Sequence, residues 1–117
     1  MNYSDAPYIR LDILEKIERV AARQGVSDIA RSPRGFLAAY KLASGDPYAM
    51  GRDQFSGQLW EDRRTYFIKR HVEQARRRRE SFWTKSGQPT RRHLALMMWA
   101  FTPTPGKTIS WVHGGRR

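Results

Sequence analysis

Residues 59–83 read LWEDRRTYFIKRHVEQARRRRESFW and contain neither glycine nor proline. An uninterrupted segment of this length predicts one α-helix of about six turns. On a helical projection, six residues lie on one side: Trp60, Phe67, Ile68, His71, Ala75 and Phe82. Arg63, Arg70 and Arg77 recur every seven residues on a neighbouring face, with Tyr66 between the first two. The segment therefore predicts a helix that buries one apolar stripe and presents a broad basic surface.

The four consecutive arginines at 76–79 span a full turn of this predicted helix. They cannot all face one ligand, because successive helical residues point in different directions. Arg76 and Arg77 are expected to face outward, and Arg79 to stand apart from them. Arg78 is expected at the edge of the apolar stripe, with packed methylenes and a guanidinium that lies at the rim or pairs with an acid from the N-terminal half.

The positive charge is distributed unevenly along the 117 residues, whose formal net charge is +11. Residues 1–62 contain 8 basic and 9 acidic residues, whereas residues 63–117 contain 14 basic and 2 acidic residues. This asymmetry favours a polyanionic partner, most often nucleic acid. Arginine outnumbers lysine by 17 to 5, and its planar guanidinium can bind phosphate with two hydrogen bonds and stack on bases. A GC-rich genome is an alternative cause of the arginine excess.

The remaining sequence predicts an all-α protein, a compact bundle of about four helices with the long basic helix at its centre. The other predicted helices cover residues 8–24, the segment from Ser32-Pro33 to Gly45, and residues 91–101 after Thr90 as the N-cap. Residues 44–58 are predicted as an irregular loop with Tyr48, Met50 and Phe55 packed on the core. The C-terminal tail is predicted to be extended, and KTISWV at 107–112 suggests a short strand paired with residues 82–84.

The length is that of one domain, so residues 1–117 are expected to fold as a single unit. Residues 1–58 would form a nearly neutral helical scaffold with a connecting loop. Residues 59–101 would contribute the long basic helix, a turn and a core helix, and residues 102–117 the tail.

Cysteine is absent, which excludes disulfides and thiolate ligands. The longest apolar run, residues 94–101, is far too short to span a bilayer. Residues 1–30 contain no continuous apolar segment of the kind found in signal peptides. We therefore expect no membrane association and a cytoplasmic location, in a bacterial or phage-infected host cell.

Catalytic and metal-binding patterns are weak in this sequence. His71 and His93 are interpreted as hydrogen-bonded core residues; as a metal or acid–base pair they would need carboxylates, and Glu73 and Glu80 are the only acids after residue 62. A metal-dependent nuclease is a further alternative, which would need clustered carboxylates to hold its metal. The only carboxylates close together in sequence are Asp46, Asp53, Glu61 and Asp62. No P-loop or dinucleotide-binding motif is present. No enzymatic activity, no metal and no cofactor is expected.

Basic and aromatic residues together predict a nucleic-acid-binding surface. The candidate residues are Arg63, Tyr66, Lys69, Arg70, Arg76, Arg77, Arg79, Trp83, Lys85, Arg91, Arg92, Arg116 and Arg117. Tyr66 and Trp83 are expected to be exposed and to stack on unpaired bases. Arg91 and Arg92 lie in the first turn of their predicted helix, where the dipole disfavours cations, which hints at a bound anion. The alternative is a solvated, charged surface without a ligand.

Three blocks of the sequence resemble a group of small, basic, uncharacterised proteins of bacteriophages and bacteria. These blocks are SPRGFLAAY at 32–40, RRTYFIKRH at 63–71 and GQPTRRHLALMMWA at 87–100. The resemblance implies a phage or bacterial origin and carries no activity or site residue. Small phage proteins of this kind include nucleic-acid binders, transcription modulators and inhibitors of host defence.

The leading hypothesis is a non-enzymatic protein that binds DNA or RNA by gripping phosphates with the basic face of its long helix. The alternative is a phage inhibitor or adaptor, for example an anti-CRISPR protein or transcription modulator, that docks on a host protein–nucleic acid complex.

Overall fold

The computed structural model describes residues 3–26 and 35–114. Its helices are η1 (Tyr3–Asp5), α1 (Leu11–Arg23), α3 (Phe36–Leu42), η2 (Pro47–Ala49), α4 (Trp60–Arg77), α5 (Arg91–Met97) and α6 (Pro105–Val112), where η denotes a 3₁₀-helix. Within the described ranges there is no β-strand, and sheet-like pairing is limited to the isolated bridges Arg52–Leu59 and Trp83–Pro89. The all-α prediction is confirmed.

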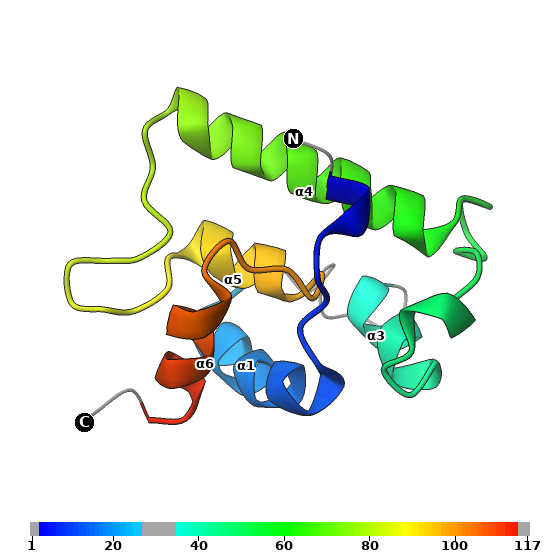
Figure 1. The fold of residues 1–117 in the computed structure, drawn as a ribbon, viewed down its shortest axis with the longest axis horizontal. Helices are drawn as coiled ribbons and strands as arrows, with labels where there is room; N and C mark the ends of the chain where they lie inside the picture. Colours follow the sequence, from blue (N-terminus) through cyan, green and yellow to red (C-terminus); the bar gives the residue numbers. More distant parts are fainter. Residues whose placement is uncertain (1–2, 27–34, 115–117) are drawn as a thin grey trace.

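The long helix α4 lies along one side of the molecule, and α5 lies in the middle (Figure 1). Helix α5 contacts both α4 and α1, α6 contacts α1, and η1 packs on α4. Most of the short helix α5 is buried, including His93, Leu94, Leu96 and Met97, as expected for a helix that is apolar on most sides. The predicted central position of the long helix is therefore not confirmed, because α5 occupies the middle.

The buried apolar side chains form two clusters. The larger cluster joins α1, α3, the start of α4 and α5, and it includes Leu14, Ile17, Phe36, Trp60 and Trp99. The smaller cluster attaches the N-terminal segment beneath α4 and consists of Tyr3, Ala6, Ile68, Leu96 and Phe101. Both clusters contain side chains of α4 and of the segment 94–101, so packing fixes the position of α4 relative to that segment.

Helix α4 is shorter than predicted, ending at Arg77 instead of continuing to Trp83. Arg79 has a left-handed backbone with φ of 56°. Its N–H donates to the carbonyl of Arg76 at 3.2 Å, and the N–H of Glu80 donates to the carbonyl of Ala75 at 2.9 Å. These two hydrogen bonds form a Schellman motif, which ends a helix. The chain must turn there because the N–H of Thr90 and the ring of His93 both bond to the carbonyl of Phe82 beside α5.

Replacing Arg79 by glycine should stabilise the protein by about 0.5–1 kcal/mol, because a left-handed backbone strains every residue with a Cβ. Denaturant unfolding of the R79G variant measures this gain. Arg78 is the control, since its φ of −90° and ψ of −1° are right-handed. R78G should be neutral or destabilising, and equal gains in both variants would contradict this account of the helix end.

Two predictions for the C-terminal region are wrong. Helix α5 stops at Met97 rather than Phe101, and Ala100 has a φ of 58°. The tail is not extended, and residues 107–112 form most of α6 instead of a strand. The spacing of Thr108, Trp111 and Val112 is helical, and it turns Thr108 into the interior while the other two pack against the larger cluster. The bridge partner of Trp83 is Pro89 and not the tail.

The N-terminal half differs from its prediction in detail. Helix α1 begins at Leu11 rather than Tyr8, because the preceding residues are extended and the N–H of Ile9 bonds to Ala100 O at 2.8 Å. The predicted cap at Ser32-Pro33 lies outside the described residues, and α3 is described from Phe36. In the loop 44–58 Met50 packs on the core as expected. The expectation for its aromatic residues is wrong, because Tyr48 is 98% and Phe55 69% exposed.

Candidate nucleic-acid interface

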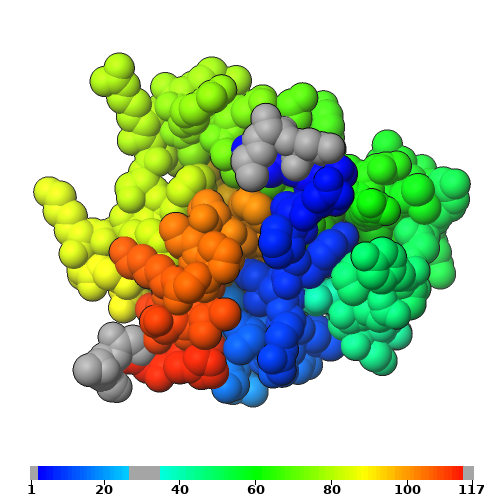
Figure 2. Space-filling model, viewed as in Figure 1, coloured from blue at the N-terminus to red at the C-terminus, as the bar shows by residue number. Residues whose placement is uncertain are grey.

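Six of the predicted binding residues are exposed cations on α4 and in the loop after it. We call them the basic surface: Lys69, Arg70, Arg76, Arg77, Arg79 and Lys85. Side chains from the end of α4 and from the following loop stand out from the body of the molecule (Figure 2). Within the described part of the chain, none of the six forms an ion pair or a side-chain hydrogen bond.

Several cations elsewhere on the protein have acidic partners, although others, such as Arg19 and Arg23, have none among the described residues. The described ion pairs include Arg10–Asp12 at 2.8 Å, Lys41–Glu18 at 2.7 Å and Arg92–Glu80 at 2.7 Å. By contrast, Glu73 is the only acidic residue in the segment 63–79, which contains eight Lys and Arg residues. The basic surface is therefore a concentration of positive charge that this part of the protein does not neutralise.

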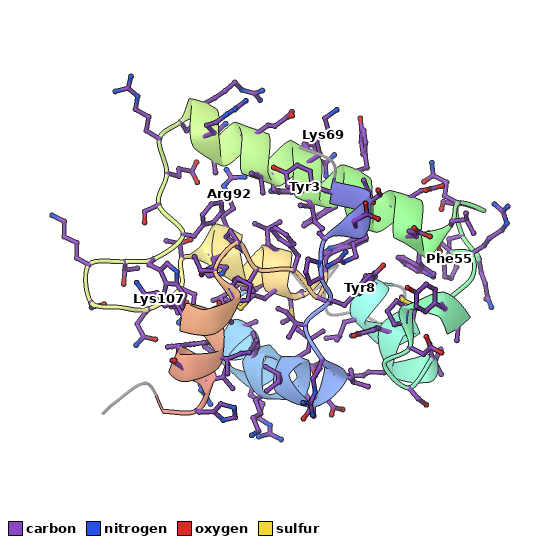
Figure 3. All side chains as sticks on the ribbon, in the orientation of Figure 1. Tyr3, Tyr8, Phe55, Lys69, Arg92 and Lys107 are labelled. Carbon is purple, nitrogen blue, oxygen red and sulfur yellow. The ribbon has the colours of Figure 1, made fainter. Side chains whose placement is uncertain are left out.

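Lys69 projects from the outer side of α4, away from the core (Figure 3). Tyr66, one turn earlier, is 68% exposed. The guanidinium of Arg70 lies 6.0 Å from the ring centre of Tyr66 and 5.9 Å from that of Phe67. Arg70 therefore lies between an exposed ring and a ring that packs on the core.

Arg63 belongs to the core edge and not to the basic surface. It forms an ion pair and hydrogen bond with the buried carboxylate of Asp53. Its guanidinium also lies over the rings of Trp60 and Trp99, at 5.0 and 5.6 Å. Burial by itself raises the pKa of Asp53, but hydrogen bonds from Phe55 N–H and a serine hydroxyl, together with the Arg63 charge, bring it below its ordinary value. Arg63 therefore fastens the loop 44–58 to α4.

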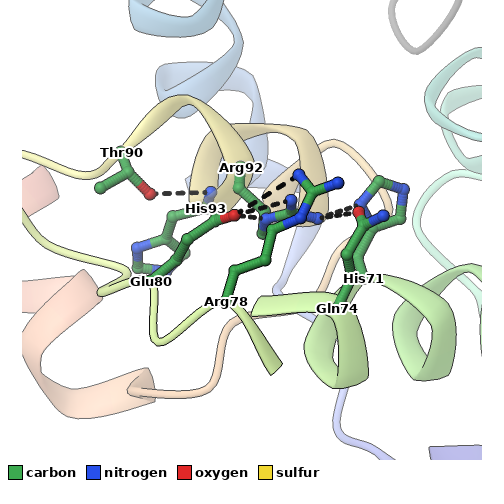
Figure 4. A network of polar contacts seen from close by, with 7 residues as sticks. All are labelled: His71, Gln74, Arg78, Glu80, Thr90, Arg92 and His93. Atoms are coloured by element: carbon green, nitrogen blue, oxygen red, sulfur yellow. Dashed lines mark hydrogen bonds and ion pairs between the residues drawn. The ribbon is translucent and has the colours of Figure 1, made fainter. Parts of the chain in front are cut away.

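Arg92 connects α5 to the end of α4 (Figure 4). Its Nε and Nη2 donate to the two carboxylate oxygens of Glu80 at 2.7 and 3.1 Å. Its Nη1 lies 2.9 Å from Gln74 Oε1 and 3.0 Å from His71 Nδ1. Arg92 holds the pKa of Glu80 below its ordinary value. Arg92, one of the two arginines for which a bound anion was predicted in the first turn of α5, is thus paired with a carboxylate of the protein itself.

The network also determines the protonation of His71. An arginine N–H only donates, so Nδ1 of His71 must accept and the ring is neutral. Burial lowers the pKa of His71, and the positive charges of Arg92 and Arg70 lower it further.

Two other candidates are occupied by internal contacts. Arg91 is exposed, and its Nη2 donates to the carbonyl of Gly25 at 2.8 Å. Trp83 is half-buried, with its ring edge-on to His93 at 5.0 Å and its Nε1 bonded to Thr104 Oγ1 at 3.0 Å. Lys107 lies 4.7 Å over the same ring. Trp83 is therefore not the exposed stacking platform that was expected.

The C-terminal Arg116 and Arg117 lie outside the described residues. Arg78 is described and differs from its prediction, with a side chain that is 61% exposed and 3.8 Å from Glu80. The expected packing of Arg78 at the edge of the apolar stripe is wrong: its backbone is still right-handed, but α4 ends at Arg77 and the Arg78 side chain is largely exposed.

Arg64 is the most informative residue that sequence analysis did not single out. It is 1% exposed and donates four hydrogen bonds to backbone carbonyls, with no carboxylate among its described partners. The acceptors are Ala6 O at 3.0 Å, Pro7 O at 2.9 Å, Trp99 O at 2.8 Å and Ala100 O at 2.9 Å. The ring of Tyr8 covers the guanidinium at 3.6 Å. Burial lowers the pKa of Arg64, and Tyr8 opposes that shift.

A sequence signal for this burial did exist. Arg64 is four residues from both Trp60 and Ile68, so it lies in the middle of the apolar stripe. The stripe is confirmed in part: these two residues and Ala75 are buried, Phe67 and His71 are half-buried, and Phe82 lies beyond the end of α4.

The histidines are confirmed as hydrogen-bonded residues. The Nδ1 and Nε2 of His93 are bonded to Phe82 O and Thr102 Oγ1, both at 2.8 Å. Among the described residues, no group of three or more His, Asp or Glu side chains is arranged to hold a metal ion. In the acidic group considered for a nuclease, Asp53 is paired with Arg63, and Asp46 caps η2 through Tyr48 N–H.

The chain matches no protein-family model, and no curated protein or solved structure shows significant similarity to it. The resemblance to small phage proteins therefore stays a prediction. In the described ranges, no helix combines the length and the apolar character that crossing a membrane requires.

Proposed function

We propose that this protein binds nucleic acid through the basic surface, with the outer side of α4 and its C-terminal end gripping phosphates. The observation that carries the proposal is the group of six exposed cations without an acidic partner in the described chain. Clustered like charges repel one another, and a polyanion relieves that repulsion while releasing its own counterions.

The core supports this role by presenting the charges on a rigid element. Trp60, Ile68 and Ala75 anchor one side of α4 in the core, so the opposite side is held toward solvent. The dipole of α4 favours Arg76 and Arg77 at its C-terminal end. The cations are thus kept in place before any ligand arrives, which lowers the ordering cost of binding.

The proposal makes a quantitative prediction about salt. The logarithm of affinity should fall linearly with the logarithm of salt concentration, and each lost phosphate contact should reduce the slope by about 0.7 on a single strand or 0.9 on a duplex. Replacing Arg76 and Arg77 together by glutamine should therefore lower the slope by between about 1.4 and 1.8. Fluorescence anisotropy at several salt concentrations measures it.

A matched control keeps the net charge change equal. Arg19 and Arg23 are exposed residues of α1, on another part of the molecule (Figure 1). Replacing both by glutamine should leave the slope nearly unchanged. Equal slope changes in the two double variants would show that total charge, and not the basic surface, drives binding.

A pull-down from host lysate tests the nature of the partner directly. A partner that disappears after nuclease treatment supports nucleic acid. A protein retained after complete nuclease digestion would point instead to docking on a host protein, which is the alternative role.

A further inference from the structure

A cleft opens beside the basic surface, along the first half of α4. It has a volume of about 370 Å³, within the range of sites that hold small organic groups. Its lining includes Gln58, Asp62, Tyr66, Phe67, Arg70 and Trp99. Arg70 belongs to both features, so the cleft and the basic surface are continuous.

Planar groups dominate this cleft. The rings of Phe67 and Trp99 are nearly parallel, with centroids 4.6 Å apart and an interplanar angle of 15°. The Arg63 guanidinium lies over Trp99, and that of Arg70 lies near the rings of Phe67 and Tyr66. Aromatic rings and guanidinium planes are the groups on which unpaired bases stack.

Tyr66 is the accessible member of this set. It is 68% exposed, whereas Trp99 is 7% exposed. The described structure shows no hydrogen bond that uses the Tyr66 hydroxyl. A large aromatic side chain that is left in water at the mouth of an aromatic cleft can stack on a planar ligand without first breaking internal contacts.

The polar groups of the cleft distinguish a base from a phosphate. Asp62 and Gln58 stand at the N-terminal end of α4, where a carboxylate repels phosphate but accepts hydrogen bonds from the N–H groups of a base edge. Cations follow at Lys69 and Arg70 and continue to Arg77. The helix rises about 17 Å over the eleven steps from Tyr66 to Arg77, enough for a nucleic-acid strand to run from the cleft along the basic surface.

We infer that the cleft receives one unpaired base of a single-stranded nucleic acid, stacked on Tyr66, while the adjoining phosphates lie on Lys69 and Arg70. This inference rests on the proposed function and adds the class of ligand to it. A base within a duplex is already stacked and paired, so it cannot enter the cleft without leaving the helix. The protein therefore prefers single strands to duplexes of equal length.

The test compares affinities for a fluorescein-labelled DNA strand of about 12 nucleotides and for the same strand annealed to its complement. Tyr66→Ala should weaken single-strand binding about tenfold, as expected for the loss of one base–aromatic stack, and leave duplex binding unchanged. Tyr66→Phe should retain wild-type affinity, since it keeps the ring. Tyr48→Ala, which removes a tyrosine that is 98% exposed on η2, is the matched control and should bind both ligands normally.

The outcomes separate the inference from the proposed function. If the Tyr66→Ala variant binds both ligands as the wild-type protein does, or loses affinity for both by the same factor, the inference that the cleft receives a base is wrong. The proposal that the basic surface binds phosphates then still stands. Failure of the wild-type protein to bind either ligand overturns both. Circular dichroism of each variant checks that folding is preserved, which the exposure of Tyr66 leads us to expect.

Discussion

Replacing Arg64 by methionine should lower the free energy of unfolding by about 4 kcal/mol or more. Methionine approximates the length of arginine but donates no hydrogen bond, so the carbonyls of Ala6, Pro7 and Trp99 lose their described partner. The carbonyl of Ala100 loses one of two, since it keeps the N–H of Ile9. Each unsatisfied buried group costs roughly 1–3 kcal/mol, and relief from burying a charge offsets part of the total. The loss should also detach the N-terminal segment, since two of the four carbonyls belong to Ala6 and Pro7.

Denaturant unfolding measures this change, and Arg70→Met on the same helix is the control. Arg70 is exposed and has no described ion pair, so its replacement should alter stability by no more than about 0.5 kcal/mol. If R64M were as stable as the wild-type protein, the hydrogen bonds of Arg64 would merely balance the cost of burying its charge. Arg64 would then make no net contribution to stability.

Lowering the pH from 7 to 5 should destabilise the protein by about 2 kcal/mol through His93 alone. Burial lowers the pKa of His93 from 6.5 to about 4, with a partly opposing contribution from the hydrogen bond to Phe82 O. In the unfolded chain the imidazole takes up a proton as the pH falls below 6.5, whereas in the folded protein it stays neutral until about pH 4. The stabilisation is thus complete above 6.5 and is lost progressively down to 4. The lowered pKa of His71 acts in the same direction.

One tautomer of the neutral His93 ring satisfies both of its hydrogen-bond partners. Its Nδ1–H donates to the carbonyl of Phe82, so Nε2 accepts from the hydroxyl of Thr102. A further hydrogen bond at 2.8 Å joins Thr102 to the buried hydroxyl of Thr108 on α6. This chain of bonds links the loop after α4, helix α5 and helix α6 around one neutral ring.

Unfolding at pH 7 and pH 5 in the wild-type protein and in His93→Asn isolates this contribution, because other titrating groups remain in both. The variant should be less stable at pH 7 but should lose about 2 kcal/mol less on acidification. His113→Asn, a substitution at an exposed position after α6, should keep the wild-type pH dependence. Identical acid sensitivity of H93N and the wild-type protein would refute the assignment.

The sequence by itself determined the helical class, the buried stripe of α4 and the cations of its outer side. These features depend on local periodicity, and a residue such as Lys69 or Arg76 faces solvent wherever the helix packs by its apolar stripe. The charge asymmetry between the two halves is a property of composition and needs no structure. Tyr66 was also assigned correctly as exposed, because it lies on the same side as these cations.

Only the tertiary structure decided which cations are internal. Arg64, Arg63 and Arg92 resemble the outer arginines in sequence, but their partners come from distant segments. Arg64 bonds to carbonyls 57 and 58 residues before it and 35 and 36 residues after it. The end of α4 at Arg77 and the helical form of α6 likewise follow from contacts with α5 and the core. Local sequence patterns cannot specify such pairings, because the energy that selects a buried guanidinium or ends a helix is contributed by groups that only folding brings together.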